Sequence, residues 1–192
     1  MPGDELLRGH EEAWFRATRH PFLERVREGT LPEDAFVAWL VQDRLFVGDL
    51  LCFQARLLAR APRRAQRVVA AGALALVDEL AWFDDHGKRL GLDLDAERLP
   101  ATRAYRALLE RLEGEPFEAA ITALWALERV YLDAWSFAAP AAPPYDAFVE
   151  HWTTPEFRAY VEELEALADP SHGDVVAAVL EAEVAFWETA LR

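Results

Sequence analysis

Apolar residues recur at intervals of three and four along almost the whole chain of 192 residues. This spacing places them on one side of an α-helix, whereas a half-buried strand would alternate apolar and polar residues. Such alternating runs are nearly absent, and Ala, Leu, Arg and Glu, which favour helices, dominate the periodic segments. The pattern therefore predicts an all-α protein.

Prolines, glycines and capping residues divide the pattern into separate helices. Thr30 followed by Glu33 resembles a capping box, and so does Ser171 followed by Asp174, while Thr153 or Thr154 would cap the helix that begins beside it. The helices that we expect cover residues 4–18, 20–28, 32–60, 63–90, 100–112, 116–138, 145–152, 154–168 and 172–191.

The chain reads as one domain over residues 1–192. A length of 192 residues with 53% hydrophobic residues is enough for one sizeable core. The proline-rich stretch 138–144 is a stiff connector and not a domain linker, because the residues after it are too few to fold alone. We therefore expect a single helical bundle.

Charge and composition exclude several classes of partner. The formal charge of −14 and the pI near 4.7 disfavour contact with a phosphate backbone, so we expect no nucleic-acid partner. No apolar run approaches the roughly 18 residues of a membrane span, and the first residues lack the pattern of a secretory signal. We expect a soluble cytoplasmic protein with no membrane partner, in which the single cysteine, Cys52, fills space in the core.

Three of the apolar stripes carry an acidic residue where leucine would be expected. An ionised carboxylate without a partner costs several kcal/mol in an apolar interior, so such acids are paired, protonated, metal-bound or next to a polar cavity. The stripes are Phe36, Trp39, Leu40, Asp43, Phe46, Val47 and Leu50; Ile121, Leu124, Trp125, Glu128, Tyr131, Leu132 and Trp135; and Val176, Val179, Leu180, Glu183, Phe186 or Trp187, and Ala190.

Each of these acids is followed by an aromatic residue three positions later, so that a carboxylate and a ring would share one wall. Glu79, next to Leu76 and Trp82 in another helix, is a fourth candidate. Carboxylates among rings suit a flat, basic heterocycle, and burial raises carboxyl pKa values toward the range of general acids and bases. The alternative is that each acid is half exposed or pairs with an arginine such as Arg44 or Arg129.

The stretch HPFLERVREGTLPEDAFVAWLVQDRLFVGDL, residues 20–50, resembles the N-terminal signature of the TenA (thiaminase II) family. The similarity continues through residues 79–95, Tyr105 and the terminal Glu183, Phe186 and Trp187. The resemblance implies a haem-oxygenase-like helical bundle with a central ligand pocket, assembled as a dimer or tetramer. It also implies an enzyme of thiamin salvage, which replaces an amino or formylamino group of an aminopyrimidine from thiamin degradation with water.

The chain departs from the better studied branch of that family, which carries a nucleophilic cysteine in the segment corresponding to 116–138. The segment reads ALERVY here and contains no cysteine. The chain is similar instead to a second branch, in which Glu128 would take the place of the thiol. The resemblance further implies that Asp43 anchors the pyrimidine, that Glu183 is an acid/base group, and that Arg44 stands where the family has tyrosine.

The resulting expectation is an aminopyrimidine hydrolase that needs no cofactor. Its expected catalytic residues are Asp43, Glu128 and Glu183. Its expected substrate-binding residues are Phe46, Glu79, Trp82, Tyr105, Tyr131, Trp152 and Phe186.

Two other functions fit the same residues. The fold also hosts dinuclear iron or manganese oxidases, whose ligand positions resemble Glu79, His86, Glu128 and Glu183. Val179 and Phe186 stand where the flanking histidines of that group are expected. A non-catalytic pyrimidine-binding protein would use the same rings and acids for affinity alone.

Overall fold

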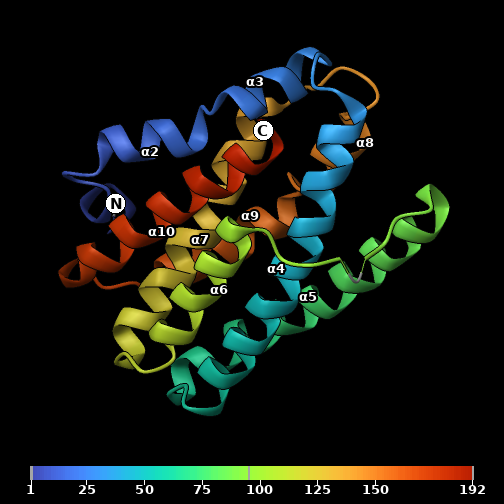
Figure 1. The fold of residues 1–192 in the computed structure, drawn as a ribbon. Coiled ribbons are helices and arrows are strands. Elements are labelled where there is room, and N and C mark those ends of the chain that lie inside the picture. The colour runs from blue at the N-terminus through green and yellow to red at the C-terminus, as the bar shows by residue number, and fades with distance from the viewer. Residues whose placement is uncertain (1, 95, 192) are drawn as a thin grey trace.

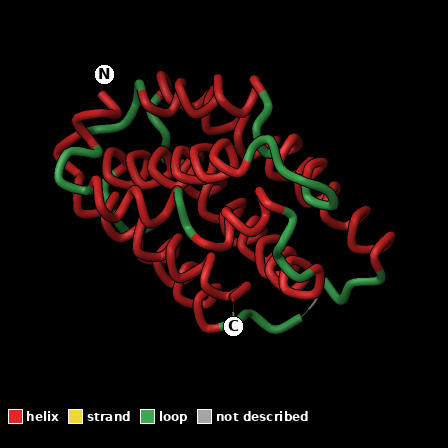
Figure 2. The backbone as a smooth tube through the Cα atoms, turned by 90° about the horizontal axis from the view of Figure 1, so that it is seen from above, coloured by secondary structure: helices red, strands yellow, loops and turns green. Residues whose placement is uncertain are grey.

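The computed structural model describes residues 2–94 and 96–191, and within them the chain forms helices joined by loops, without a strand (Figures 1 and 2). The prediction of an all-α protein is confirmed. The helices are α1 (Pro2–Leu6), α2 (Glu11–Thr18), α3 (Pro21–Glu28), α4 (Glu33–Ala59), α5 (Arg63–Leu90), α6 (Pro100–Leu112), α7 (Phe117–Ala138), α8 (Asp146–His151), α9 (Pro155–Glu165) and α10 (Gly173–Trp187), with short 3-10 helices η1 (Pro170–His172) and η2 (Glu188–Leu191).

The long helices begin and end within two residues of their predicted bounds, but the predicted helix over residues 4–18 is wrong. This segment forms α1 and α2, which are separated at Gly9. Gly9 has a φ of +86°, a left-handed conformation that interrupts a right-handed helix and that residues with a side chain rarely adopt. The last helix is also shorter than predicted, because α10 ends at Trp187 and the chain continues as the 3-10 helix η2.

The predicted capping box at Thr30 is not formed. The N–H groups of Thr30 and Leu31 both donate to the carbonyl oxygen of Arg25, at 2.8 and 3.2 Å, so these residues complete the end of α3. Pro32 then occupies the N-cap position of α4 and has no side chain that could cap it. The four-residue capping motif does not show that the backbone of its first residue, Thr30, is already bonded to the preceding helix.

The other two cap predictions have different outcomes. The Thr154 side chain accepts a hydrogen bond of 3.2 Å from the N–H of Phe157, which confirms Thr154 as the cap of α9. The Ser171 box is not formed, because the N–H of Ser171 itself donates to the side chain of Asp169 and opens η1 instead of α10.

Helix α7 lies at the centre of the core, and every residue from 119 to 128 is buried. Near the end of α7, one of its aromatic rings packs together with rings from α3, α4 and α10. The Trp39 ring lies 5.4 Å from that of Trp135 and 5.6 Å from that of Trp187, which in turn stacks on Phe22 at 5.3 Å. Because these rings come from four helices, their contacts fix the directions of those helices relative to one another.

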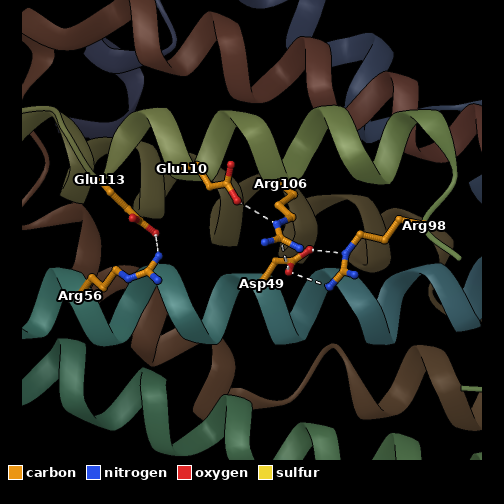
Figure 3. A network of polar contacts seen from close by, with 6 residues as sticks. All are labelled: Asp49, Arg56, Arg98, Arg106, Glu110 and Glu113. Carbon is orange, nitrogen blue, oxygen red and sulfur yellow. Dashed lines mark hydrogen bonds and ion pairs between the residues drawn. The ribbon is translucent and has the colours of Figure 1, made fainter. Parts of the chain in front are cut away.

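Charged side chains connect α4 with α6 and the loop before it (Figure 3). Asp49 accepts two hydrogen bonds from Arg98, at 2.8 and 2.9 Å, and lies 4.0 Å from Arg106. Further along, Arg56 pairs with Glu113. A bidentate pair restricts orientation as well as distance, so this network sets how α6 lies on α4.

The remaining side of α4 is covered by α5, which runs alongside it (Figure 1), while α9 packs against α7 and α5. Cys52 on α4 is exposed, so the expectation that it fills the core is wrong. No helix in the described residues is long and apolar enough to cross a membrane.

Candidate functional site

A cavity of about 450 Å³ lies between α4, α5, α7 and the segment from the end of α8 into α9. Most of its wall is apolar or aromatic. The polar or ionisable side chains that line it are Asp43, Glu79, Glu128, Tyr131, His151, Thr154, Glu156 and Tyr160. A largely apolar chamber with a few convergent polar groups is the usual form of a site for a small molecule.

Asp43 is buried at the wall of this cavity with one oxygen paired and the other free. Its Oδ2 accepts a hydrogen bond of 3.0 Å from the hydroxyl group of Tyr131, whereas Oδ1 is buried and has no partner among the described residues. Burial raises the pKa of Asp43 well above its ordinary range, the Tyr131 hydrogen bond opposes this rise, and the charges of Glu79 and Glu183 add to it. A buried oxygen without a partner is uncommon in folded proteins, so this carboxyl group is a candidate for contact with a ligand.

Glu128 lies on the cavity side of α7 and is 7% exposed. Burial raises its pKa to about 8, with further increases from the charges of Glu79 and Glu183. A carboxyl group with a pKa near neutrality can both hold and release a proton at physiological pH, which is what general acid–base chemistry requires.

Glu183 lies in a second layer, outside the residues that line the cavity. Its Oε2 accepts a hydrogen bond of 2.9 Å from the Tyr105 hydroxyl, and both residues are buried. Burial raises the pKa of Glu183 to about 8, and the bond from Tyr105 opposes this rise. The Tyr105 ring packs at 4.5 Å on Phe46, which does line the cavity. The charge of Glu183 contributes to the raised pKa values of Asp43 and Glu128.

Glu79 connects α5 with the end of α8. Its Oε1 accepts a hydrogen bond of 2.9 Å from Trp152 Nε1, and its Oε2 lies 2.7 Å from His151 Nε2. The His151 ring stacks on Trp82 with the two planes 4° apart and the ring centres 4.1 Å apart. These contacts hold a third carboxyl group at the cavity wall.

The two arginines that offered an alternative explanation for the acids are engaged elsewhere. Arg44 pairs with Asp84 at 3.0 Å, and Arg129 pairs with Asp133 and Glu165. Neither arginine pairs with the acids in the apolar stripes. The pKa values of Asp43 and Glu128 are raised mainly by burial, and the charges of Glu79 and Glu183 add to the rise.

The cavity brings together six of the ten residues predicted for the site. Those six are Asp43, Phe46, Glu79, Glu128, Tyr131 and Trp152. The other four, Trp82, Tyr105, Glu183 and Phe186, lie behind the wall. Phe186 packs on Phe46 with the ring centres 5.6 Å apart, and Trp82 packs on His151.

Four polar residues of the wall, His151, Thr154, Glu156 and Tyr160, were missed in the sequence. His151 directly precedes Trp152, which was predicted, and ends the short helix α8. Tyr160 follows Phe157 by three residues on α9, and both line the cavity. The same search for an aromatic stripe, applied to 154–168, would have found Phe157 and Tyr160.

The alternative metal site is not formed. No three His, Cys, Asp or Glu residues in the part of the chain that the structure describes are grouped so that they could hold a metal ion. His86 Nδ1 lies 3.0 Å from the carbonyl oxygen of Trp82, and both ring nitrogens lie within 2.9 Å of Arg89 Nη2. Both oxygens of Glu79 and Oε2 of Glu183 are bonded to the partners described above.

Comparison with known proteins places this architecture in a family. Residues 7–192 match the profile of the TENA/THI-4/PQQC family. The chain belongs to this family. The resemblance inferred from the signature at residues 20–50 is thereby confirmed, together with the haem-oxygenase-like helical fold that it implied.

Relatives of this TENA/THI-4/PQQC member match it over most of its length. A protein of Glycine max named "Probable bifunctional TENA-E protein" is 30% identical, over 94% of this chain and 89% of its own. The crystal structure of a TenA homologue from Pyrococcus furiosus superposes with a TM-score of 0.92 at 29% identity, covering 99% of this chain and 100% of its own. A structure described as a TenA family transcription regulator, from Silicibacter sp. TM1040, has a TM-score of 0.91 at 18% identity, covering 100% and 96%, and shares the fold.

Proposed function

We propose that this protein is an aminopyrimidine hydrolase of thiamin salvage, which replaces an amino or formylamino group of its substrate with water. The observation that carries the proposal is the pairing state of Asp43. One carboxyl oxygen is held by Tyr131, and the other is buried and unpaired at the wall of a ring-lined cavity. Membership of the TENA/THI-4/PQQC family and the name of the soybean relative agree with this proposal.

Recognition of the pyrimidine follows from the shape and polarity of the wall. The amino group of an aminopyrimidine and the ring nitrogen next to it form a donor–acceptor edge, and a carboxyl group can bond both atoms when it carries a proton. Burial raises the pKa of Asp43 well above its ordinary range, which favours this protonated form. Phe46, Tyr131 and Trp152 supply flat faces for the ring at the same wall.

Glu128 activates the water in this proposal. In its ionised form the carboxylate accepts a proton from the attacking water and returns it to the departing nitrogen. Glu183, held by Tyr105, contributes by raising the pKa of Glu128 toward the working range. No covalent intermediate on a thiol is required.

The test is the substitution Glu128→Gln, which preserves shape and removes basicity. We expect turnover of formylaminomethyl- and aminomethyl-pyrimidines to fall by roughly 100-fold or more, while the dissociation constant for the product changes little. Glu165→Gln is the matched control, since Glu165 is a buried acid that bonds the N–H of Gly3 and Arg129 outside this cavity. Unchanged turnover in the Glu128 variant would refute its role.

Binding without turnover would identify a non-catalytic pyrimidine-binding protein instead. A thermal shift with a panel of aminopyrimidines detects binding, and product analysis of the same mixtures detects hydrolysis.

The cytoplasmic location and the homo-oligomer remain part of the proposal. Leu74 and Val77 are 63% and 49% exposed on α5, which supports contact with a second copy, and light scattering would establish the assembly.

A further inference from the structure

A buried glutamine holds the hydroxyl group of Tyr160 at the cavity. Gln54 on α4 is fully buried, and its Nε2 donates to the carbonyl oxygen of Val69 at 2.9 Å and to the hydroxyl oxygen of Tyr160 at 3.0 Å. A carbonyl oxygen only accepts, so the amide must present its NH₂ group on this side. The Tyr160 oxygen therefore accepts from Gln54, and its own proton is left for another acceptor.

That proton has no acceptor in the part of the chain that is described. The amide of Gln54 keeps its orientation even though its own Oε1 is buried without a partner there. A buried acceptor without a partner is unfavourable and is uncommon in folded proteins. The Gln54 side chain is thus oriented so that it binds the Tyr160 hydroxyl, although its own Oε1 has no hydrogen bond in the described residues.

Gly72 on α5 provides the space for this bond. A methyl group at Gly72 would lie 2.1 Å from the Tyr160 hydroxyl oxygen and 2.2 Å from Gln54 Nε2, far inside van der Waals contact. Gly72 and Tyr160 both line the cavity, so this contact belongs to the cavity wall. Any larger residue would displace Tyr160 from Gln54.

The Tyr160 hydroxyl and Glu128 share one environment. Burial raises the pKa of Tyr160 well above its ordinary value, and the charge of Glu128 raises it further. Tyr160 therefore remains protonated at neutral pH and can donate a hydrogen bond. Tyr160 lines the cavity from α9, and Glu128 lines it from α7.

We propose that Tyr160 donates a hydrogen bond to the amide oxygen of a formylamino substrate and stabilises the negative charge that develops there. This inference rests on the proposed hydrolase function. Water adds to the formyl carbon, and Glu128 takes a proton from that water. The electron pair of the carbonyl bond moves onto the oxygen that Tyr160 contacts. The carbon–nitrogen bond then breaks, the nitrogen takes a proton from Glu128 to leave as the amine, and the carbon leaves as formic acid.

In this arrangement Gln54 and Gly72 are positioning residues, which act only through Tyr160. Donors aimed at a developing oxyanion stabilise the transition state more than the ground state, so their removal lowers kcat more than it changes binding. The amine product has no amide oxygen, and its affinity should not depend on Tyr160.

The test compares Tyr160→Phe with wild type on a formylaminomethyl-aminopyrimidine and its amine product. We expect kcat for the formylamino compound to fall by roughly 100-fold, with KM and the calorimetric Kd of the amine each changed by less than about threefold. Tyr145→Phe is the matched control, because the Tyr145 hydroxyl donates to the carbonyl oxygen of Leu31 and does not line the cavity. It should leave all three values unchanged.

The Tyr160→Phe variant leaves one N–H of Gln54 unpaired, which lowers stability. The double variant Gln54→Leu/Tyr160→Phe removes both partners and should show the same selective loss of kcat. Gly72→Ala should also lower kcat for the formylamino compound with Tyr160 intact.

Unchanged kcat in the Tyr160 variants, or an equal loss of kcat and of affinity for the amine, would overturn the role of Tyr160 and leave the hydrolase function standing. A wild-type protein that hydrolyses neither compound would overturn the proposed function and this inference together.

Discussion

The hydroxyl group of Tyr131 donates to Oδ2 of Asp43 at 3.0 Å, while Oδ1 of the same carboxyl is buried and has no partner in residues 2–94 and 96–191. One helix, α7, supplies the donor, and another, α4, supplies the acid. The bond restricts rotation of the Asp43 carboxyl group and so restricts the direction in which the second oxygen points. In the proposed function this oxygen contacts the ligand.

Substitution of Asp43 should therefore affect ligand affinity. In Asp43→Asn, the side chain can no longer exchange a proton with a ring nitrogen, and we expect the Kd for an aminopyrimidine to rise at least about tenfold, or roughly 1.4 kcal/mol. Isothermal titration calorimetry measures it. Asp49→Asn on the same helix is the control, since Asp49 pairs with Arg98 outside the cavity and its loss should alter stability but not affinity. Equal affinity in the Asp43→Asn variant and the wild-type protein would contradict this assignment.

The raised pKa of Glu128 predicts how stability depends on pH. A carboxyl group whose pKa rises from 4.5 to about 8 on folding binds more protons in the folded state. Its favourable contribution is complete below the unfolded value and is lost as pH rises through about 8. Between about pH 5 and about pH 9 the free energy of unfolding should decrease less for Glu128→Gln than for wild type, as measured by urea denaturation. Parallel curves for the two proteins would show that Glu128 does not titrate in this range.

The charge of Glu79 should affect the pH dependence of the proposed hydrolysis. If Glu128 works as a base, activity rises with pH through its pKa, and Glu79 is one of the charges that raise this value. Glu79→Gln should shift the midpoint of the rising limb of kcat/KM toward lower pH. Asp78→Asn, a neighbouring exposed position on α5, should leave the midpoint where it is. A shift in the opposite direction would mean that Glu79 acts through its bonds to His151 and Trp152 and not through its charge.

Two glycines should respond in opposite ways to substitution by alanine. Gly9 has a φ of +86°, so Gly9→Ala strains the backbone and should lower the free energy of unfolding by about 1 kcal/mol. Gly48 lies within α4, and nothing lies within 4 Å of a methyl group added there. Gly48→Ala should raise stability by about 0.5–1 kcal/mol. Thermal unfolding of both variants checks the pair, and destabilisation of equal size at both positions would contradict this reading of Gly9.

The sequence by itself determined the helical class and most helix bounds, because these depend on spacing and on residues that start or stop a helix within a few positions. Helix α5 was predicted at its observed bounds, residues 63–90, since Pro62 and Gly91 flank it. The same local reasoning failed at Thr30, where the end of α3 already uses the backbone that the capping motif requires. Local rules hold where no neighbouring element competes for the same groups.

The sequence also identified three of the four acids that line the cavity, Asp43, Glu79 and Glu128 but not Glu156, because an acid within an apolar helical stripe conflicts with the core around it. It could not separate Glu128, at the cavity wall, from Glu183, behind it, since both have the same position in their stripes. Nor could it find the bond from Gln54 to Tyr160, which joins residues 106 positions apart across a glycine of a third helix. Periodicity gives the side of a helix that faces inward, whereas which inward side chains meet, and which border empty space, depends on how the helices cross, and only the packed structure decides that.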